Sequence, residues 1–541
     1  MRHGRLAPAG PFALAALLVG CAEPPGPALP RLTVVLAVDQ LRADYLERFE
    51  EHYTGGLRRL LEEGAYFHAA AYRHSSTSTG PGHATISTGR HPAAHGIVGN
   101  SWREPGVGRV YCVDDDRYEP VGGPGTGASP QALLTETLGD LLKRAHPGAK
   151  IYSVSTKDRS AILMGGHRAD GAFWFEPDCA CLVSSTYYGD RMPGWLERFN
   201  ASGPGAAHAG RIWDRLLGDP ALYERLARAD DFPGEGDGQG EMFPHRLPED
   251  GFGSLLARTP YSDEITLGAA LAALESGEIG TDDVPDLLFV GLSATDSIGH
   301  RYGPFSQEAM DNHLRLDRRL GEFLEEVDRV VGPGRSVIAL SADHGAMPLV
   351  EQLRANGDAS ARRIDTSAFW KRATPAIEEC GQGSASEVVD DAAGRSLHWN
   401  GAALGERGVA REKASACLQT WLSGQPEVAE VFTAEDLSGP VDSQFAALYR
   451  NSYREGRSPH LQVHFAESAY PGGPNGTGHG SAHAHDRRVP VVLAGFGVVP
   501  GRHASEAGPE DVAPTLGVLL GLELQLESDT RVLSEALGPA R

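Results

Sequence analysis

The chain has 541 residues, is 41% hydrophobic and 22% charged, and carries a formal net charge of −23 at pH 7. This length and composition predict a globular protein with a sizeable core, built either as several domains or as one large α/β domain with insertions. The acidity excludes the basic footprint that binds nucleic acid, so we expect no nucleic-acid-binding surface. An anionic substrate would have to be held by metals or by local cations.

The N-terminal residues are typical of an exported protein. Arg2 and Arg5 precede the apolar stretch 12–21, which is too short to span a bilayer and predicts a signal peptide over residues 1–21. Leu18-Val-Gly-Cys21 resembles the lipobox of bacterial lipoproteins, and an ordinary secretory signal is the alternative. The proline-rich residues 22–31 then predict a tether before a folded domain. We therefore expect a periplasmic or cell-envelope lipoprotein of a bacterium, in contact with the membrane only through an N-terminal lipid.

Strand-like and helix-like segments alternate along the chain. Runs of apolar residues predict buried parallel strands at residues 32–38, 150–155, 287–292, 337–340 and 489–495. Apolar residues at helical spacing predict helices at residues 41–49, 56–64, 132–143, 265–274, 308–331 and 511–520. This alternation indicates an α/β fold with a mostly parallel central sheet and helices on both faces.

Two stretches interrupt the alternation. Residues 190–260 are rich in glycine, proline and charge, and residues 350–470 show no strand–helix rhythm apart from a possible strand at 462–465. We interpret both stretches as insertions into a catalytic domain of residues 32–541 that fold over one edge of its sheet.

Five cysteines follow the one in the lipobox, so at least one of them is unpaired or intermolecular. Cys380 and Cys417 form a possible disulfide if the protein is exported. Cys179 and Cys181 could bind a metal, but a loop with one paired and one free thiol is the favoured interpretation. The remaining cysteine is Cys112.

Six side chains that can bind a metal lie beside the apolar runs: Asp39, Asp296, His300, Asp343, His344 and His479. Ligands of open α/β sheets bind beyond the carboxyl ends of the strands, so we expect these side chains at one sheet edge. A mixture of carboxylates and imidazoles suits zinc, whereas oxygen ligands alone would suit magnesium or calcium. The set is large enough to hold two divalent metals.

Residues 74–85 are crowded with hydroxyl groups that could act as a nucleophile. A free hydroxyl is a poor nucleophile, but metal coordination activates it. Spacing alone leaves five candidates open, and a Ser/Thr-rich loop is usually only a capped turn. The candidates are Ser75, Ser76, Thr77, Ser78 and Thr79.

Several motifs of this chain resemble the alkaline phosphatase superfamily, and most closely its phosphate-irrepressible bacterial branch with a Thr nucleophile. The matching segments are Val38–Tyr45, Thr79–His83, His95–Trp102, Ser155–Arg159, Asp296–His300, Ala342–Gly345 and Gly478–Ser481. They occur in family order between residue 32 and about residue 500. The resemblance implies the superfamily's α/β fold, with insertions over the active-site edge, and Thr79 as the nucleophile.

The resemblance also implies two Zn²⁺ ions. One would be held by Asp39, Thr79, Asp343 and His344, and the other by Asp296, His300 and His479. His483 and His485 compete with His479 for its role, and we prefer His479 because His-Gly-Ser before the last strand is the family motif. No catalytic magnesium is expected, since a Lys stands where other alkaline phosphatases place that site.

Three further residues separate two substrate classes. Lys157 and Arg159 match the monoesterase branch and would supply two cations to a doubly charged phosphoryl group, to which Asn100 would also donate. We therefore predict an exported, zinc-dependent phosphate monoesterase that acts on small-molecule phosphate monoesters through a phospho-threonine. A nucleotide pyrophosphatase/phosphodiesterase is the alternative.

Two other functions are less favoured. A sulfatase would need a Cys or Ser in its own sequence context, and no Cys lies near Thr79. A non-catalytic binding protein of the envelope would not need a nucleophile beside two metals. The pattern predicts neither the natural substrate nor the oligomeric state.

Overall fold

The structure is a computed structural model of the chain, and it describes residue 1, residues 29–236, residue 240 and residues 242–538. The predicted signal peptide and most of the predicted tether therefore lie outside the described residues. Among the described helices, none is both long and apolar enough to cross a membrane.

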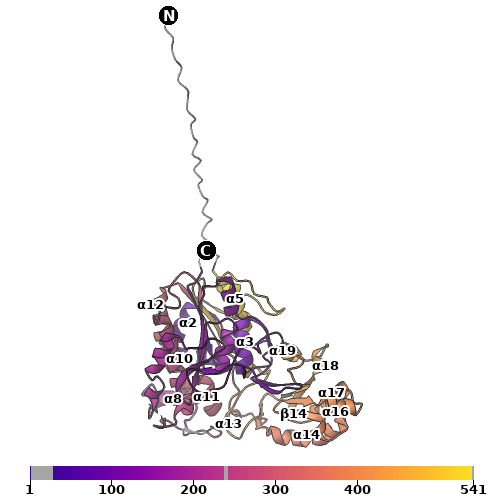
Figure 1. Cartoon of the computed structure of the whole chain (residues 1–541). Helices are drawn as coiled ribbons and strands as arrows, with labels where there is room; N and C mark the ends of the chain where they lie inside the picture. The colour runs from indigo at the N-terminus through magenta and orange to yellow at the C-terminus, as the bar shows by residue number, and fades with distance from the viewer. Residues whose placement is uncertain (2–28, 237–239, 241, 539–541) are drawn as a thin grey trace.

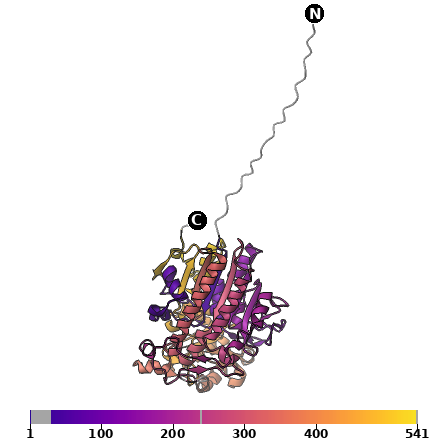
Figure 2. The ribbon, with the colours of Figure 1, turned by 90° about the vertical axis from the view of Figure 1, so that its left-hand side faces the viewer.

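A ten-stranded sheet organises the main part of the molecule, here called the body (Figures 1 and 2). Its centre consists of parallel strands in the order β12-β1-β11-β6-β7, with bounds Ser336–Ser341, Leu32–Val38, Asp286–Leu292, Ile151–Ser155 and Gly171–Glu176. The outer strands are β19 (Val491–Gly495), β2 (Ala65–Phe67), β20 (Gly501–His503), β8 (Cys181–Ser185) and β5 (Pro120–Val121). The predicted fold class, a mostly parallel sheet between helices, is confirmed.

One strand direction was predicted wrongly. β19 was expected to be parallel, but it pairs antiparallel with both β12 and β2. An apolar run shows that a strand is buried on both faces, but it carries no information about direction. The antiparallel course places the amino end of β19 beside the carboxyl ends of the parallel strands.

The strand β1 shows why the sheet is covered on both faces. Its side chains alternate between faces, and Leu32, Val34 and Leu36 pack into one core while Val35 and Ala37 pack into another. The first core includes residues of α2 (Gly56–Glu63), α10 (Tyr261–Glu275) and α12 (Gln307–Val331), and the second includes residues of α5 (Leu138–Ala145) and α21 (Val512–Leu519).

The predicted helix at residues 132–143 begins later than expected. Helix α5 starts at Leu138, because the Thr137 side chain accepts from Asp140 N while the Asp140 side chain accepts from Thr137 N. This capping box satisfies the first free N–H groups of the helix and fixes its start. The leucines before Thr137 belong to a turn.

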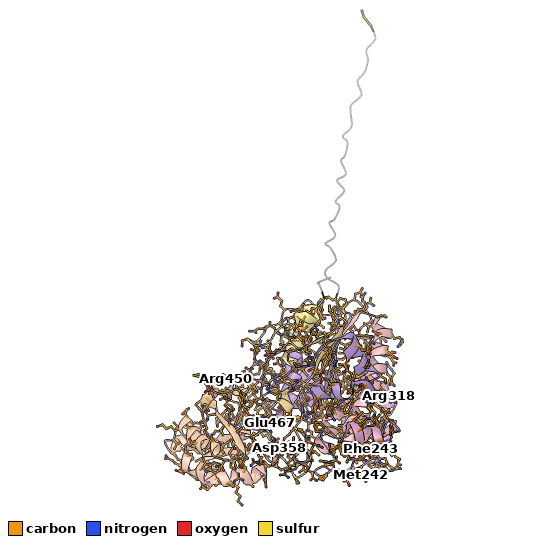
Figure 3. The ribbon with its side chains drawn as sticks, turned by 180° about the vertical axis from the view of Figure 1, so that it is seen from behind. Met242, Phe243, Arg318, Asp358, Arg450 and Glu467 are labelled. Atoms are coloured by element: carbon orange, nitrogen blue, oxygen red, sulfur yellow. A yellow bond between two sulfur atoms is a disulfide. The ribbon has the colours of Figure 1, made fainter. Side chains whose placement is uncertain are left out.

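Residues 350–470 form a lobe with its own sheet and core, on the right of the body in Figure 1. Its four strands run in the order β14 (Val389–Ala393), β15 (Ser396–Trp399), β17 (Leu461–Phe465) and β16 (Val428–Thr433). Helices α14 (Thr366–Gly381) and α17 (Arg411–Ser423) cover the sheet and are joined by a Cys380–Cys417 disulfide. Figure 3 shows the labelled Asp358 and Glu467 near the junction with the body, and Arg318 on the far side of the body.

The described residues between 190 and 260 form no second lobe, and the segment 213–223 packs on α12. Trp213 Nε1, Leu216 N and Tyr223 OH all donate to the buried Asp311 carboxylate, at 2.7, 2.6 and 2.7 Å. One carboxylate of a long helix thus anchors this irregular segment.

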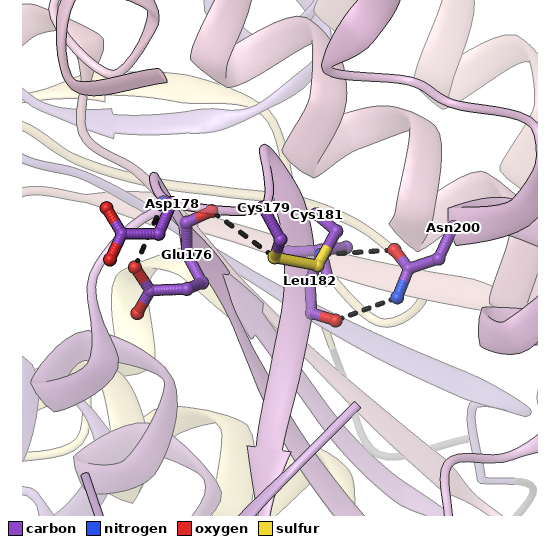
Figure 4. Close-up of a disulfide and its surroundings, with 6 residues drawn as sticks. All are labelled: Glu176, Asp178, Cys179, Cys181, Leu182 and Asn200. Carbon is purple, nitrogen blue, oxygen red and sulfur yellow. Dashed lines mark hydrogen bonds between the residues drawn. A yellow bond between two sulfur atoms is a disulfide. The ribbon is translucent and has the colours of Figure 1, made fainter. Parts of the chain in front are cut away.

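The cysteines pair differently from the favoured interpretation. The predicted Cys380–Cys417 disulfide is present, but Cys179 and Cys181 are also bonded to each other, so both interpretations of that pair were wrong (Figure 4). Ala180 between them has φ 47°, which turns the chain tightly enough to bring the two sulfurs together. Cys112 is free and buried.

The chain enters and leaves the body at the same end of it. Residues 29–31 lead into the amino end of β1, and Leu537 forms a bridge with Val498, just beyond the carboxyl end of the antiparallel β19. Figures 1 and 2 show these ends at the top.

Candidate active site

The carboxyl ends of the parallel strands meet at one edge of the sheet, and the candidate side chains gather there. Asp39 directly follows β1, and Asp343 lies two residues after β12. Asp296 stands in the first turn of α11 (Ala294–Tyr302), just beyond β11. His479 reaches the same edge from the loop before β19, because that strand runs in the opposite direction.

One buried group consists of Asp39, His83 and Asp343, whose ligand atoms lie within 4.8 Å of one another. His83 Nε2 is 3.1 Å from Asp39 Oδ1, and His83 Nδ1 is 3.6 Å from Asp343 Oδ2. Sequence analysis did not assign His83 to the site. Its position four residues after Thr79 places both side chains on one face of a helix, and this spacing is a signal that could have found it.

A second group consists of Asp296, His300 and His479. The Nε2 atoms of the two imidazoles are 3.2 and 3.7 Å from Asp296 Oδ1. His344 lies between the groups, with Nε2 3.2 Å from Asp343 Oδ2 and 4.0 Å from Asp296 Oδ1. The structure therefore brings together all six of the metal-capable side chains predicted from the sequence.

The imidazoles of His300, His344 and His479 share one orientation. Each Nδ1 lies against a main-chain carbonyl oxygen, at 2.7, 2.9 and 2.7 Å, and therefore carries the proton. Each Nε2 then faces the carboxylates and could bind a metal there once it carries no proton, which is the usual state of a metal-binding histidine.

Four metal-capable atoms of the site are buried without a hydrogen-bond partner among the described residues: Asp39 Oδ1, His83 Nε2, Asp343 Oδ2 and His344 Nε2. Burying such atoms unpaired costs free energy. A cation between them would remove this cost, and carboxylate plus imidazole is a suitable donor set for a divalent transition metal. The residues therefore fit metal ions.

Lys157 lies between the two groups. Its Nζ is 2.7 Å from Asp39 Oδ2 and 2.7 Å from Asp296 Oδ2. Burial is the largest single influence on Asp296 and opposes its ionisation, but the Lys157 ammonium together with His300 and His344 outweighs burial and holds the pKa of that carboxyl well below its usual value. Burial likewise opposes the charge on Lys157, but Asp296 and Asp39 raise the pKa of its ammonium. Lys157 thus stays protonated and partly neutralises both groups.

Thr79 is the first residue of a helix, α3 (Thr79–Thr88), where sequence analysis expected a loop. The residue is nearly buried, with 1% exposure, and its main-chain oxygen lies 2.9 Å from His83 Nδ1 of the first group. Gly82 permits this placement, since a Cβ on it would lie 2.3 Å from the Asp343 carbonyl oxygen. The close packing fixes the start of α3 against the end of β12.

Asn100 and Arg159 both contact the start of α3. Arg159 Nη2 donates to Thr79 Oγ1 at 3.2 Å, and Asn100 Oδ1 accepts from Gly80 N at 2.7 Å. Arg159 Nε is buried and has no partner in the described part of the chain. A guanidinium with unused donors beside a hydroxyl is suited to bind an anion there.

Gln40 is a second residue that sequence analysis missed. It is fully buried, with N donating to Asp343 Oδ1 at 2.9 Å and Nε2 donating to Asp296 Oδ1 at 2.8 Å. Its φ of 64° is unusual for a residue other than glycine. One residue, through its main-chain N–H and its side-chain amide, therefore orients a carboxylate in each group.

His483 and His485 do not join these groups. His483 Nε2 is 2.9 Å from Phe465 O, and His485 Nδ1 is 2.8 Å from Asp486 Oδ1. Of the three histidines that competed for one role, the structure places only His479 beside Asp296.

A family model described as type I phosphodiesterase / nucleotide pyrophosphatase matches residues 33–459. The chain belongs to this family. The predicted membership of the alkaline phosphatase superfamily is thereby confirmed.

Relatives named alkaline phosphatase extend the similarity over nearly the whole chain. Alkaline phosphatase PafA of Elizabethkingia meningoseptica is 31% identical over 94% of this chain and 95% of its own length. Alkaline phosphatase PhoV of Synechococcus elongatus is 31% identical over 94% and 93%.

Solved structures agree with this family membership. The crystal structure of wild-type PafA matches 96% of this chain and 100% of its own with a TM-score of 0.89 at 29% identity. A PafA variant with a Thr, an Asn, a Lys and an Arg substituted matches with a TM-score of 0.88 at 28% identity. Murine ectonucleotide pyrophosphatase/phosphodiesterase 5, at 13% identity and a TM-score of 0.54, shares the fold.

Proposed function

We propose that this protein is an alkaline phosphatase, a zinc-dependent hydrolase of small-molecule phosphate monoesters that works through phospho-Thr79. The observation that carries the proposal is the contact between Arg159 Nη2 and Thr79 Oγ1 at an edge lined by two groups of carboxylates and imidazoles. A hydroxyl, a cation with unused donors and two metal-capable groups are the parts that phosphoryl transfer needs.

The relatives support the choice of monoesters. The proteins similar over nearly the full length of the chain are named alkaline phosphatases. The four residue types substituted in the PafA variant are those of Thr79, Asn100, Lys157 and Arg159, in the same chain order. The family description also covers phosphodiesterases, so diester hydrolysis is the second candidate.

The residues of this chain divide the reaction between them. Arg159 and Asn100 orient the phosphoryl group so that Thr79 Oγ1 faces phosphorus and the ester oxygen points away. Thr79 Oγ1 forms the new P–O bond as the bond to the leaving oxygen breaks, and the alcohol departs. Water then attacks phospho-Thr79, releases phosphate and restores the hydroxyl. Two in-line displacements predict net retention at phosphorus.

Two zinc ions would supply Lewis-acid charge to the nucleophilic, leaving and phosphoryl oxygens when bound. We propose Asp39, Thr79, Asp343 and His344 as ligands of one ion. We propose Asp296, His300 and His479 as ligands of the other. Lys157 reduces the repulsion between the carboxylates and adds a positive charge for the phosphoryl oxygens.

The test compares p-nitrophenyl phosphate with bis-p-nitrophenyl phosphate, using enzyme of known metal content. We expect about two zinc ions per chain, faster turnover of the monoester, and loss of activity with a chelator that is reversed by zinc. Faster turnover of the diester would favour the second candidate. Full activity in metal-free protein would contradict the metal sites.

We also propose that the protein is exported and held by a lipid on Cys21. Two disulfides fit an oxidising compartment, since they rarely persist in the cytosol. A Cys21→Ala variant should move from the membrane fraction to the soluble periplasmic fraction. An unchanged membrane association of Cys21→Ala would contradict the lipid anchor.

A further inference from the structure

A β-hairpin brings two residues to the phosphoryl-binding side of the site. Strand β3 (Ser101–Glu104) begins directly after Asn100, and β4 (Gly108–Tyr111) ends at Tyr111. Ser101 and Tyr111 are paired at the base of this hairpin, and Cys112 N donates to Asn100 O at 3.0 Å. Asn100 and Tyr111 are therefore held side by side although eleven residues apart in sequence.

The Tyr111 hydroxyl lies between the Asp158 carboxylate and the Arg159 guanidinium. It donates to Asp158 Oδ1 at 2.8 Å and accepts from Arg159 Nη1 at 3.1 Å. Arg159 Nη2 on the same guanidinium reaches Thr79 Oγ1. One edge of the guanidinium is thus fixed by Tyr111 and the other faces the nucleophile.

Asp158 is a competing partner for the same guanidinium. Its Oδ1 is only 3.7 Å from Arg159 Nη1, longer than a hydrogen bond but close enough to attract the cation. With the hydroxyl in place, Asp158 is occupied by Tyr111 OH and by Arg159 N at 2.6 Å. Without it, the guanidinium would turn toward Asp158 and away from Thr79.

We propose that Tyr111 is a specificity-determining positioning residue, which holds Arg159 toward Thr79 so that the site prefers doubly charged phosphate monoesters over diesters. This inference rests on the proposed function. The preference for monoesters follows from charge, because a monoester carries one more negative charge than a diester and so gains more from a correctly placed guanidinium.

The hydroxyl can serve this role over a wide pH range. Burial raises the pKa of Tyr111 well above its ordinary value, and the nearby Arg159 guanidinium only partly opposes the shift. The phenol therefore remains a donor to Asp158 in alkaline solution.

Tyr111→Phe tests the inference by removing one oxygen. We expect kcat/KM for p-nitrophenyl phosphate to fall about 10- to 100-fold, the usual effect of losing a group that orients a ligand-binding residue. kcat/KM for the bis ester should change by less than about 3-fold. Zinc content and Tm should match the parent, and Tyr118→Phe, in the loop beyond the hairpin, should leave both esters unaffected.

A double-mutant cycle with Arg159→Ala identifies the route of the effect. If Tyr111 acts through Arg159, Tyr111→Phe should change monoester turnover by less than about 2-fold in the Arg159→Ala background. Equal losses for both esters, or independent effects of the two substitutions, would overturn the inference.

Asp158→Ala provides a second approach should Tyr111→Phe fold poorly. Without Asp158 the Tyr111 hydroxyl can still accept from Arg159 and no carboxylate competes for the guanidinium, so the monoester-to-diester ratio should stay within about 3-fold of the parent, and a larger fall would count against the inference. A failure of the proposed function would be recognised separately, because the parent enzyme itself would then not hydrolyse p-nitrophenyl phosphate.

Discussion

The body and the lobe differ in what they contribute to the site. All of the candidate metal-binding and phosphoryl-binding residues lie in the body, just beyond strand ends, on helices α3, α6 (Asp158–Gly165) and α11, before β3 and in the loop before β19. The lobe has its own sheet, core and disulfide, and it touches the candidate residues through Arg395, whose Nη1 is 3.5 Å from His479 O. The comparison teaches that the candidate residues belong to the sheet edge, while the lobe supports the loop before β19 and the segment before α3.

The lobe is fastened to the body mainly by side chains that bind main-chain carbonyls. Arg457 Nη1 donates to Gly96 O and Ala132 O at 2.7 Å each, and Asn451 Nδ2 donates to Arg73 O at 2.7 Å. A cavity of about 470 Å³ lies beside this junction, between the β3–β4 hairpin and the lobe.

The largest expected effect comes from the body. Thr79→Ala should lower kcat/KM for p-nitrophenyl phosphate about 10⁴-fold, because removing a nucleophile abolishes the covalent route. Mass spectrometry of acid-quenched enzyme should detect a phosphorylated peptide containing Thr79 in the parent and none in the variant. Thr77→Val is the matched control, because it removes the neighbouring hydroxyl that donates to Ser481 O. Its kcat/KM should fall by less than about 10-fold. A Thr79→Ala variant as active as the parent would contradict the assignment of the nucleophile to the body, and with it the contrast between the body and the lobe.

A buried histidine makes the body sensitive to acid. His313 packs between Tyr45 and Phe49, and both of its ring nitrogens are buried and unpaired among the described residues. Burial, assisted by the Arg48 cation, lowers the pKa of His313 to about 3 from 6.5. The unfolded chain therefore takes up the proton first, and stability falls as pH drops from 6.5 toward 3, by up to about 5 kcal/mol.

The substitution His313→Leu should remove the pH dependence of stability that this histidine gives to the body, and it should leave the stability of the lobe unchanged. The lobe has its own buried imidazole, His464, whose pKa burial and His483 lower to about 3. Calorimetry at pH 7 and pH 4.5 should show two transitions, with only the one assigned to the body gaining acid resistance. Equal gains in both transitions would mean that the two regions unfold together.

The disulfide in the lobe should affect stability but not chemistry. Replacing Cys380 and Cys417 by Ser opens a loop of 37 residues, which should cost about 4 kcal/mol by loop-closure entropy. We expect a lower Tm for the lobe and an unchanged kcat. The Cys179→Ser, Cys181→Ser variant is the control, because that bridge spans only two residues and closes almost no loop. A large loss of kcat in the first variant would show that the lobe takes part in catalysis.

The smallest effect should come from the contact between the two regions. Arg395→Ala removes the guanidinium behind the His479 loop and should weaken binding of the second zinc ion about 10-fold. Competition with a fluorescent chelator measures this affinity, and saturating zinc should restore full activity. Arg318→Ala on the far side of the body is the control (Figure 3). An unchanged affinity in Arg395→Ala would leave the lobe without influence on the metal site.

The sequence allowed the sheet and most of the site to be predicted, because both depend on local patterns. The runs at β1, β11 and β12 are apolar enough to mark buried strands, and Asp39, Asp296 and Asp343 follow them closely. The possible strand at residues 462–465 is confirmed as β17, but the other strands of the lobe's sheet were missed, because a strand such as β14 (Val389–Ala393) is partly exposed and carries Asp390 and Asp391.

The residues missed at the site depend on contacts between distant segments. Gln40 was overlooked because its partners are 303 and 256 residues away, and Tyr111 because its partner Arg159 is 48 residues away. The direction of β19 was wrong for a similar reason, since direction is set by the connections and not by the strand itself. Local pattern thus predicted which metal-capable residues meet at the sheet edge, but not which residues orient them there.

The position of the chain ends has a consequence for where substrates come from. The chain enters the body at the amino end of β1, and the candidate residues lie at the opposite end of that strand, about 23 Å away for seven residues. An enzyme held at a membrane by its N-terminus would therefore present its reactive edge to the surrounding solution. Such an orientation favours diffusing phosphate esters over the headgroups of the lipids beneath it.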